Sequence, residues 1–598
     1  MALAAVLRFW DLSHIPYTPD ELSALLRLYP TIGETIQKGV MEGDTHPPGV
    51  QVFEWLWTRA FGMSEVAVKL PFILMGLAAL FFVYRVACAW VNTSVGLITV
   101  ALLSTLQYTV TYGQIARPYA FGFFTCALLL DQLTRYAATD RRSALVGFAL
   151  AASLCAYSHH FALLFAVLVT LGGVLLLRKK QMLPYVLACA GALLLYVPNI
   201  PILLHQFGKG GLTEWLAPPG SYWLRDYAAW IIMYSWPLAI ALAGVAAWST
   251  LNSVRLGKWR ERLPWLMLLW GLAPLIIGYA YSVRVAPVLQ YSMLIFSLPC
   301  LFLAMFHGLP KLNTRWSTAI VLGFTVLGEH GLIAKRDHYD LFYNSKYEAF
   351  ANAVHSAGPR KLVIIDAPQG VMDFYGERSP ESDPRRYVLL SQVRGTAHLQ
   401  RLLSDPAKDE VLLGITPSTL PELSAIVQQF FPEFVSTEHY CEGTILRLRR
   451  GPHTTPKTNV KELPLSVWSD STVVEYPAIV EADVRSVIEG NNDVIEVRAT
   501  FRAGSNDDIV LAGDLFNEGK SVIHRENHMD NTGVDAGGRI TLHLAFNLSD
   551  YEMRGRNLHF KAYVHNHTGR WFGTPEIVVA VRPGNPVVYG LYEPIGGN

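Results

Sequence analysis

Two adjacent carboxylates, Asp20 and Glu21, stand near the start of the 598-residue chain. They follow Thr18 and Pro19, and this spacing predicts a capping box, in which the threonine caps a helix and the glutamate bonds back to the cap. A capping box occupies Glu21 and leaves Asp20 free. A carboxylate fixed at a helix start can take the proton of a hydroxyl group, which is general-base chemistry. The structural and the catalytic interpretation of this segment are compatible.

A second cluster, Asp44-Thr45-His46-Pro47-Pro48, precedes a stretch rich in aromatic residues. Its structural interpretation is a helix entry stiffened by two prolines, beside aromatic residues of a membrane interface. In the functional interpretation, Asp44 and His46 orient reacting groups without exchanging protons with them.

Three cations form the next group of candidates. Arg117 precedes Pro118 and Tyr119 at the end of an apolar run, and Arg284 and Lys209 lie at or near the ends of other apolar runs. A planar guanidinium can donate two parallel hydrogen bonds to phosphate oxygens. Arg117, together with Arg284 or Lys209, is therefore a candidate for binding a phosphate. Tyr119 is expected to orient a ligand beside it.

The turn Ser158-His159-His160 brings two histidines together. Adjacent residues of a helix point about 100° apart, which disfavours one shared metal ion and favours structural hydrogen bonds. His159 is nevertheless a candidate orienting residue. A divalent metal is neither required nor excluded by the sequence, because no set of ligands occurs at a specific spacing.

The composition indicates which elements position these residues. Only 16% of the residues are charged and 51% are hydrophobic, against about 25% charged residues in soluble domains. Apolar runs follow one another from Leu70 to Leu327, while the chain is polar from Lys335 onward. This division excludes a purely soluble enzyme and a disordered or fibrous protein. The formal net charge of +1 provides no field that would attract nucleic acid.

Apolar runs of about 20 residues are long enough to cross a bilayer as helices. Residues 1–10 are too short to cross and are expected to be the end of a longer first span. Lys and Arg gather in alternate short loops, which predicts that those loops are cytoplasmic. We therefore predict about eleven spans in a transmembrane domain over residues 1–335, with the N-terminus in the cytoplasm and the loop 11–66 and the polar half outside. The approximate bounds of the further spans are 70–89, 95–112, 118–134, 143–158, 161–177, 182–204, 227–250, 264–283, 286–306 and 316–333.

The polar half is expected to contain two parts. Strand-like and helix-like patterns alternate over residues 336–450, which predicts a small α/β unit. Residues 451–463 are a predicted linker. Short alternating runs separated by turns predict an antiparallel β-sandwich over residues 464–598, with the expected role of a protein- or glycan-binding accessory domain. The individual elements predicted are 361–366, 397–403, 411–415, 420–430, 494–501, 509–515, 539–546, 558–564 and 576–581.

In these motifs the sequence resembles glycosyltransferase family 39, which includes the protein O-mannosyltransferases and the lipid A aminoarabinose transferase and has the C-type glycosyltransferase fold. The resemblance covers about residues 1–350 and implies that Asp20 or Glu21 corresponds to the family's catalytic acidic pair. The sequence departs from the family at Lys69 and Gln290, where arginine is usual or frequent. The matching motifs, in order, are Asp20-Glu21, Asp44-x-His46-Pro47-Pro48, Ser64-Glu65-x-Ala67-x-Lys69-Leu70-Pro71, Arg117-x-Tyr119 and the Ser-His-His turn.

The resemblance implies a membrane glycosyltransferase that takes a sugar from a polyprenyl-phosphate donor. Asp20 or Glu21 would be the general base, and Arg117, with Arg284 or Lys209, would stabilise the charge on the departing phosphate. Displacement in a single step predicts inversion at the sugar carbon. The acceptor hydroxyl would belong to a protein, a lipid or a glycan, and the enzyme would act in the cell envelope at the periplasmic face of a bacterial inner membrane.

Two other classes of protein are alternatives to a membrane glycosyltransferase. A lipid-linked sugar flippase or transporter would place charged residues at the centres of its spans and often contain an internal repeat. The sequence shows neither of these features. A sugar sensor, in which the polar half binds glycan and the spans serve as an anchor, would not need eleven spans or an acidic first outer loop.

Overall fold

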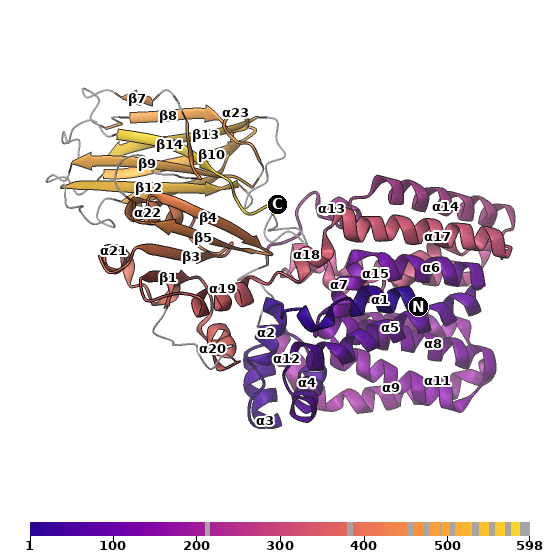
Figure 1. Cartoon of the computed structure of the whole chain (residues 1–598). Coiled ribbons are helices and arrows are strands. Elements are labelled where there is room, and N and C mark those ends of the chain that lie inside the picture. Colours follow the sequence, from indigo (N-terminus) through magenta and orange to yellow (C-terminus); the bar gives the residue numbers. More distant parts are fainter. Residues whose placement is uncertain are drawn as a thin grey trace. The chain divides into compact units, whose positions relative to one another are not determined.

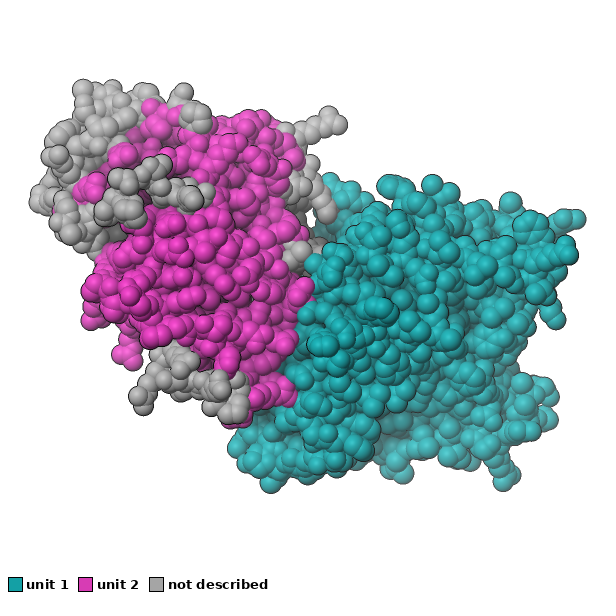
Figure 2. Space-filling model, viewed as in Figure 1, with its two compact units in different colours: residues 1–343 teal, residues 344–598 magenta. Residues whose placement is uncertain are grey.

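The structure of the chain is a computed structural model. It divides into two compact units, Met1–Tyr343 and Asn344–Asn598 (Figure 2). The residues that it describes are 1–209, 216–378, 387–451, 459–463, 465, 467–469, 475–476, 478–490, 492–502, 509–528, 538–548, 557–567 and 576–586.

The first unit is helical (Figure 1). Two short π-helical segments, Thr35–Glu42 and Gly331–Lys335, interrupt the α-helices. The α-helices are α1 (Ala2–Phe9), α2 (Pro19–Leu25), α3 (Ile32–Glu34), α4 (Pro48–Phe61), α5 (Glu65–Trp90), α6 (Thr93–Thr105), α7 (Gln107–Gln114), α8 (Pro118–Thr139), α9 (Arg142–Ser158), α10 (His160–Gly173), α11 (Lys179–Tyr196), α12 (Ile200–Gly208), α13 (Trp223–Ile231), α14 (Trp236–Arg255), α15 (Arg262–Arg284), α16 (Leu298–Phe306), α17 (Thr314–His330) and α18 (His338–Phe342).

The surface of these helices is that of a membrane protein. Five described helical segments are long and apolar enough to cross a membrane, and α6 and α7 add a sixth span if the bent pair is counted as one. Leu171 of α10, Leu194 of α11 and Leu251 of α14 are 67%, 72% and 72% exposed. Large apolar side chains that face outward in this way match the hydrocarbon of a bilayer. The chain is therefore a polytopic membrane protein, and the number of eleven spans stays a prediction.

Several of the predicted spans are not single straight helices. The span predicted over 95–112 is bent by 64° between α6 and α7. The span predicted over 227–250 is divided between α13 and α14, because Met233 and Tyr234 adopt left-handed backbone conformations with φ of 57° and 52°. In the span predicted over 286–306, a 3-10 helix precedes α16.

The bend between α6 and α7 is filled by Arg8 of α1. Its buried guanidinium donates hydrogen bonds to the main-chain carbonyls of Leu103, Ser104 and Thr109, each at 3.1 Å. A break in a helix leaves carbonyls without amide partners, and the guanidinium supplies the missing donors. Helix α7 is thereby held at an angle to α6, and the chain runs from its end through residues 115–117 into α8.

The first unit extends to Tyr343, past residue 335 where the sequence predicted the end of the domain. The reason is the packing of α18. His338 is fully buried, with Nε2 3.0 Å from Oε1 of Gln114 on α7, and the hydroxyl of Tyr339 donates to the carbonyl of Leu7 at 2.7 Å.

The second unit begins with a three-layer α/β arrangement. Its sheet has the order β2-β1-β3-β5-β4, in which β1 is parallel to β2 and β3, and β5 is antiparallel to both of its neighbours. Alternate residues of β1 point to opposite faces, where α19 and α20 cover one side and α21 and α22 the other. These elements are α19 (Lys346–His355), β1 (Lys361–Ile365), α20 (Gln369–Arg378), β2 (Val388–Leu389), α21 (Gly395–Leu403), β3 (Glu410–Ile415), α22 (Glu422–Phe430), β4 (Glu433–Tyr440) and β5 (Gly443–Arg449).

Two further sheets, of order β11-β10-β13-β8-β7 and β12-β9-β14-β6, enclose a shared apolar core. All pairs within them are antiparallel. Most of the predicted linker, residues 452–458, lies outside the described residues. The elements are β6 (Lys461–Glu462), β7 (Val467–Ser469), β8 (Ala478–Asp483), α23 (Val484–Val487), β9 (Val494–Arg502), β10 (Ile509–Asn517), β11 (Lys520–His528), β12 (Arg539–Asn547), β13 (Leu558–Asn566) and β14 (Glu576–Arg582).

Candidate active site

The start of α2 fixes the two adjacent carboxylates. Thr18 is the cap, and its Oγ1 accepts a hydrogen bond from the amide of Glu21 at 3.2 Å, while the amide of Thr18 donates to Oε2 of Glu21 at 2.8 Å. The predicted capping box is confirmed. Since the side chains of consecutive helical residues diverge by about 100°, Asp20 and Glu21 reach different surroundings.

The carboxylate of Glu21 is fully buried and fully engaged. Lys69 of α5 donates to both of its oxygens, at 2.7 and 2.6 Å, and the amide of Ala116 donates to Oε1 at 2.6 Å. The pair ties α2 to α5 and to the segment between α7 and α8. A carboxylate that accepts all these hydrogen bonds has no position left for a substrate hydroxyl, so the geometry favours Asp20 over Glu21 as the base.

Asp20 faces outward, with 43% of its side chain exposed. As predicted, the capping box does not engage Asp20, but the carboxylate has partners from another segment. Oδ1 of Asp20 lies 3.2 Å from Nε of Arg117, and the hydroxyl of Tyr119 donates to Oδ2 at 3.1 Å. Arg117 and Tyr119 reach it because the chain makes a tight turn at residues 115–117, where the amide of Arg117 donates to the carbonyl of Ile115 at 2.9 Å, and then enters the first turn of α8.

Arg117 joins Asp20 to the second predicted cluster. Its Nη1 lies 3.7 Å from Oδ2 of Asp44, which also accepts from Arg27 at 2.7 Å, and Nδ1 of His46 lies 2.8 Å from the other oxygen of Asp44. Burial acts to raise the pKa of Asp44, but the charges of His46, Arg117 and Arg27 hold this pKa well below its ordinary value. Asp44 is therefore ionised at neutral pH and anchors Arg117 on the side away from Asp20.

Of the two other predicted phosphate-binding cations, Lys209 joins this cluster. Its Nζ donates to the main-chain carbonyls of Glu42 and Asp44 at 3.1 and 3.0 Å. Arg284 is exposed at the end of α15, and its side chain forms no hydrogen bond or ion pair with any other residue that the structure describes. The structure thus does not connect Arg284 to the cluster.

The two histidines of the Ser-His-His turn have structural partners. The ring of His159 packs edge-on against His46, with 5.1 Å between the ring centres, and its Nδ1 accepts from the amide of Phe161 at 3.0 Å. Nε2 of His160 lies 3.0 Å from the carbonyl of Thr45. Over the described part of the chain, no three His, Cys, Asp or Glu residues are arranged to hold a metal ion.

A series of aromatic rings leads away from Asp20. Tyr119 contacts Tyr112 with 4.7 Å between ring centres, Tyr108 contacts Trp230 at 4.9 Å, and Trp230 contacts Tyr291 at 5.3 Å. Tyr108 and Tyr112 are also in contact, at 5.7 Å, so the series is continuous. Such rings offer apolar faces on which a sugar or an isoprenoid chain can pack.

Two residues of this region, Glu54 and Arg27, were not among those predicted from the sequence. Glu54 of α4 is 2% exposed, and neither of its carboxylate oxygens has a hydrogen-bond partner among the described residues. Burial raises its pKa to about 8, although the charge of Arg117 opposes the rise. The sequence could have indicated Glu54, because a single acidic residue stands there between two aromatic residues, Phe53 and Trp55. No residue near Arg27 in the sequence indicated its ion pair with Asp44.

Comparison with known proteins supports part of this picture. The family model of dolichyl-phosphate-mannose-protein mannosyltransferase matches residues 45–202. This match confirms the resemblance to glycosyltransferase family 39 over a segment that contains His46, Arg117 and His159, whereas Asp20 lies before it. No curated protein matches the chain.

Several solved structures are similar to the chain. ArnT from Cupriavidus metallidurans in the apo state is 13% identical, with a TM-score of 0.45 over 76% of this chain and 98% of that one. The oligosaccharyltransferase of Archaeoglobus fulgidus in complex with zinc and sulfate is 9% identical, with a TM-score of 0.38 over 94% and 96% of the two chains. The arabinofuranosyltransferase AftD from mycobacteria is 13% identical, with a TM-score of 0.40 over 97% of this chain and 60% of that one.

Proposed function

We propose that the chain transfers a sugar from a polyprenyl-phosphate donor to an acceptor hydroxyl, with inversion at the sugar carbon. The observation that carries this proposal is the contact of a half-exposed carboxylate, Asp20, with a buried guanidinium, Arg117. The matched family model names a dolichyl-phosphate sugar as donor, and dolichyl phosphate is a polyprenyl phosphate.

Arg117 is suited to receive the donor's phosphate. Nε of Arg117 is buried and has no hydrogen-bond partner of good geometry among the described residues, although Asp20 lies within ion-pair distance. When the bond from the sugar to the phosphate breaks, its electron pair stays on the phosphate and adds negative charge. A guanidinium and the ammonium of Lys209 would stabilise that charge. Arg284 is a second candidate for this contact.

Asp20 is suited to receive the acceptor's proton. The acceptor oxygen forms its new bond to the sugar carbon while its proton passes to Asp20. In the structure Asp20 is paired with Arg117, so a phosphate that takes over the charge of Arg117 would release Asp20 towards the acceptor. Phosphate departs without protonation, and a single carboxylate therefore suffices for a one-step, inverting displacement. Glu21, Asp44, His46 and His159 would position the reacting groups.

The proposed site lies at the periplasmic face of a bacterial inner membrane. Support comes from the basic residues of the opposite loops, which mark the cytoplasmic side. The residues of the site belong to the loop 11–66 and to helix ends that share its side in the predicted topology. The acceptor would be a protein, a lipid or a glycan of the cell envelope.

A flippase that moves a lipid-linked sugar without transferring it is the alternative. The test is to incubate the purified protein in liposomes with a panel of radiolabelled polyprenyl-phosphate sugars and an extract of cell-envelope acceptors. We expect label to leave the polyprenyl lipid and appear on an acceptor. Label that changes leaflet but stays on the polyprenyl lipid with every donor would support the flippase and contradict transfer.

A further inference from the structure

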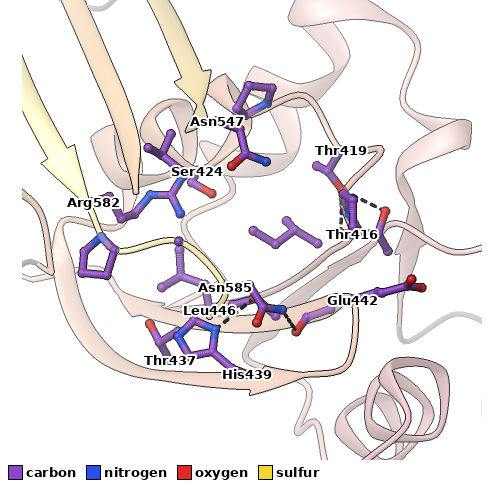
Figure 3. Close-up of a pocket in the computed structure, with 18 of the residues that line it drawn as sticks. Thr416, Thr419, Ser424, Thr437, His439, Glu442, Leu446, Asn547, Arg582 and Asn585 are labelled. Atoms are coloured by element: carbon purple, nitrogen blue, oxygen red, sulfur yellow. Dashed lines mark hydrogen bonds between the residues drawn. The ribbon is translucent and has the colours of Figure 1, made fainter. Parts of the chain in front are cut away.

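Glu54 of α4 is a buried carboxylate without hydrogen bonds. It is 2% exposed, and neither of its carboxylate oxygens has a hydrogen-bond partner among the described residues. Most polar groups that are buried in proteins do have such partners. In the second unit, for example, the side-chain amide of Asn585 (Figure 3) donates to the carbonyls of Tyr440 and Gly443 at 2.9 and 2.8 Å. A carboxylate that is left without any partner therefore needs an explanation.

Glu54 faces the interior because of its position on α4. Gln51, Glu54 and Thr58 are the buried polar residues of this helix, and their spacing of three and four residues places them on one face. Nε2 of Gln51 donates to the carbonyl of Ala24 at 2.8 Å, and Oγ1 of Thr58 donates to the main-chain carbonyl of Glu54 at 2.8 Å. The side chains on either side of Glu54 are thus engaged, whereas its carboxylate is not.

Glu54 lies in the electrostatic field of the candidate active site. The interaction with Arg117 is mutual, because Glu54 joins Asp20 and Asp44 among the carboxylates whose charges act on that guanidinium. Asp20 and Asp44 lie 3.2 and 3.7 Å from nitrogens of Arg117, while Glu54 forms no ion pair with any described residue. Glu54 therefore influences Arg117 without binding it. The charged groups that act most on Glu54, in descending order, are those of Arg117, Glu21, Asp44 and Arg27.

The other elements packed on α4 carry ionisable groups that are bonded elsewhere or exposed. On α5, the ammonium of Lys69 donates to both oxygens of Glu21. Arg117 is thus the cation that would respond most to a charge on Glu54. The remaining ionisable residues are Glu65 in the first turn of α5, Lys38 and Glu42 of the π-helical segment Thr35–Glu42, and Arg142, Cys155 and Tyr157 of α9.

The neutral and the ionised form of Glu54 would have opposite effects on Arg117. Burial raises the pKa of Glu54 to about 8, so its carboxyl group is protonated at neutral pH. In this form it leaves the guanidinium to Asp20, Asp44 and an incoming phosphate. An ionised Glu54 would need a counter-charge at a position that offers it no hydrogen bond. It would then compete with the donor's phosphate for Arg117.

We propose that Glu54 is a positioning residue, held as a neutral acid so that Arg117 stays available to the phosphate of the donor. This inference rests on the proposed transfer from a polyprenyl-phosphate donor and adds a proton requirement to it. The donor binds to the form of the protein in which Glu54 is protonated. Affinity for the donor therefore falls as the pH rises through the pKa of Glu54.

The test measures how a phosphodiester without a sugar, polyprenyl methyl phosphate, binds to the full chain in detergent micelles at about pH 7 and about pH 9.5. A phosphodiester keeps its single charge over this range, so a change in affinity reports on the protein. We expect the wild type to bind about tenfold more weakly at the higher pH, where Glu54 is mostly ionised. Glu54→Gln, which keeps the shape of the neutral acid, should show less than about a twofold change. Glu42→Gln removes an exposed carboxylate of the same loop and is the matched control, expected to keep the wild-type dependence on pH.

Two results would overturn the role of Glu54 and leave the donor site intact. The first is that the wild type binds the phosphodiester equally well at both pH values. The second is that the affinity of Glu54→Gln, shown to be folded by its thermal unfolding, falls with pH as steeply as that of the wild type. A wild-type chain that binds no phosphodiester at either pH would contradict the proposed donor site, and the role of Glu54 with it. Failure of this inference and failure of the proposed function are therefore distinguishable.

Discussion

Asp20 and Glu21 are neighbours in the chain, but the start of α2 turns their carboxylates into opposite environments. Glu21 is fully buried against Lys69, while 43% of the Asp20 side chain is exposed beside Arg117. One carboxylate is thus committed to holding three segments together, and the other is open to a substrate. An acidic pair that looks equivalent in sequence therefore separates into a positioning residue and a candidate base.

The buried pair of Glu21 and Lys69 yields a prediction about stability. We expect Glu21→Gln to lower the free energy of unfolding by about 3–5 kcal/mol, because it leaves the Lys69 ammonium buried without a counter-charge. The double variant Glu21→Gln/Lys69→Met removes both charges and should recover much of that loss. Thermal unfolding of the purified proteins checks this. Equal stability of the single variant and the wild type would show that the pair does not hold the site together.

The contacts of Arg117 predict an effect on donor binding. Arg117→Lys keeps the charge but loses the paired hydrogen-bond donors of the guanidinium. We therefore expect the KM for the polyprenyl-phosphate sugar to rise about 10- to 100-fold. Arg284→Ala serves as the comparison, because the structure does not connect Arg284 to the cluster. A large rise in KM for Arg284→Ala and none for Arg117→Lys would show that the phosphate is bound at the end of α15 and not by Arg117.

Glu54 predicts a pH dependence of stability. Its pKa is raised from an ordinary value of 4.5 to about 8, because its carboxylate is buried without hydrogen bonds. Between these pH values the folded chain binds the proton that the unfolded chain has released. The contribution of Glu54 is therefore fully present below about pH 4.5 and is lost as pH rises to about 8.

This dependence is measured by thermal unfolding between pH 5 and pH 9. We expect Glu54→Gln to remove part of the fall in unfolding temperature over that range and to be more stable than the wild type at the alkaline end. Glu261→Gln, at an exposed position, is the control and should follow the wild type. If the unfolding temperature of Glu54→Gln fell with pH as steeply as that of the wild type, Glu54 would already be ionised in the folded wild-type protein over this range.

A single displacement predicts the configuration of the product. NMR of the glycosylated acceptor should show the anomeric configuration opposite to that of the donor. Retention would require a covalent intermediate or a second carboxylate in a role that Glu21, bound to Lys69, is not placed to fill.

Local patterns in the sequence predicted much of this molecule. The capping box at Thr18, the buried strand at 361–366 and the alternating strand at 494–501 are present, because each depends on neighbouring residues alone. Strand β11 (Lys520–His528) was missed, since its side chains are mostly polar and it lies at the edge of its sheet. Edge strands lack the clear alternation of strands that are packed on one face.

Local sequence patterns did not predict the contacts between segments that are distant in the chain. Nothing near Arg27 indicates that it pairs with Asp44, and nothing near Arg8 indicates that it fills the bend between α6 and α7. Both are arginines in apolar surroundings that bind groups far away in the chain. The partner of Asp20 was missed for the same reason, because Arg117 reaches it only through the tight turn at residues 115–117.

The most direct test of the central claim is the single-turnover rate of sugar transfer by Asp20→Asn, measured with the donor already bound. Asp11→Asn, which alters an exposed carboxylate of the same loop, is the matched control. We expect Asp20→Asn to bind the donor like the wild type and to transfer the sugar about 10²–10⁴ times more slowly. Transfer at the wild-type rate by Asp20→Asn would show that another group takes the acceptor's proton, and would contradict the proposed mechanism.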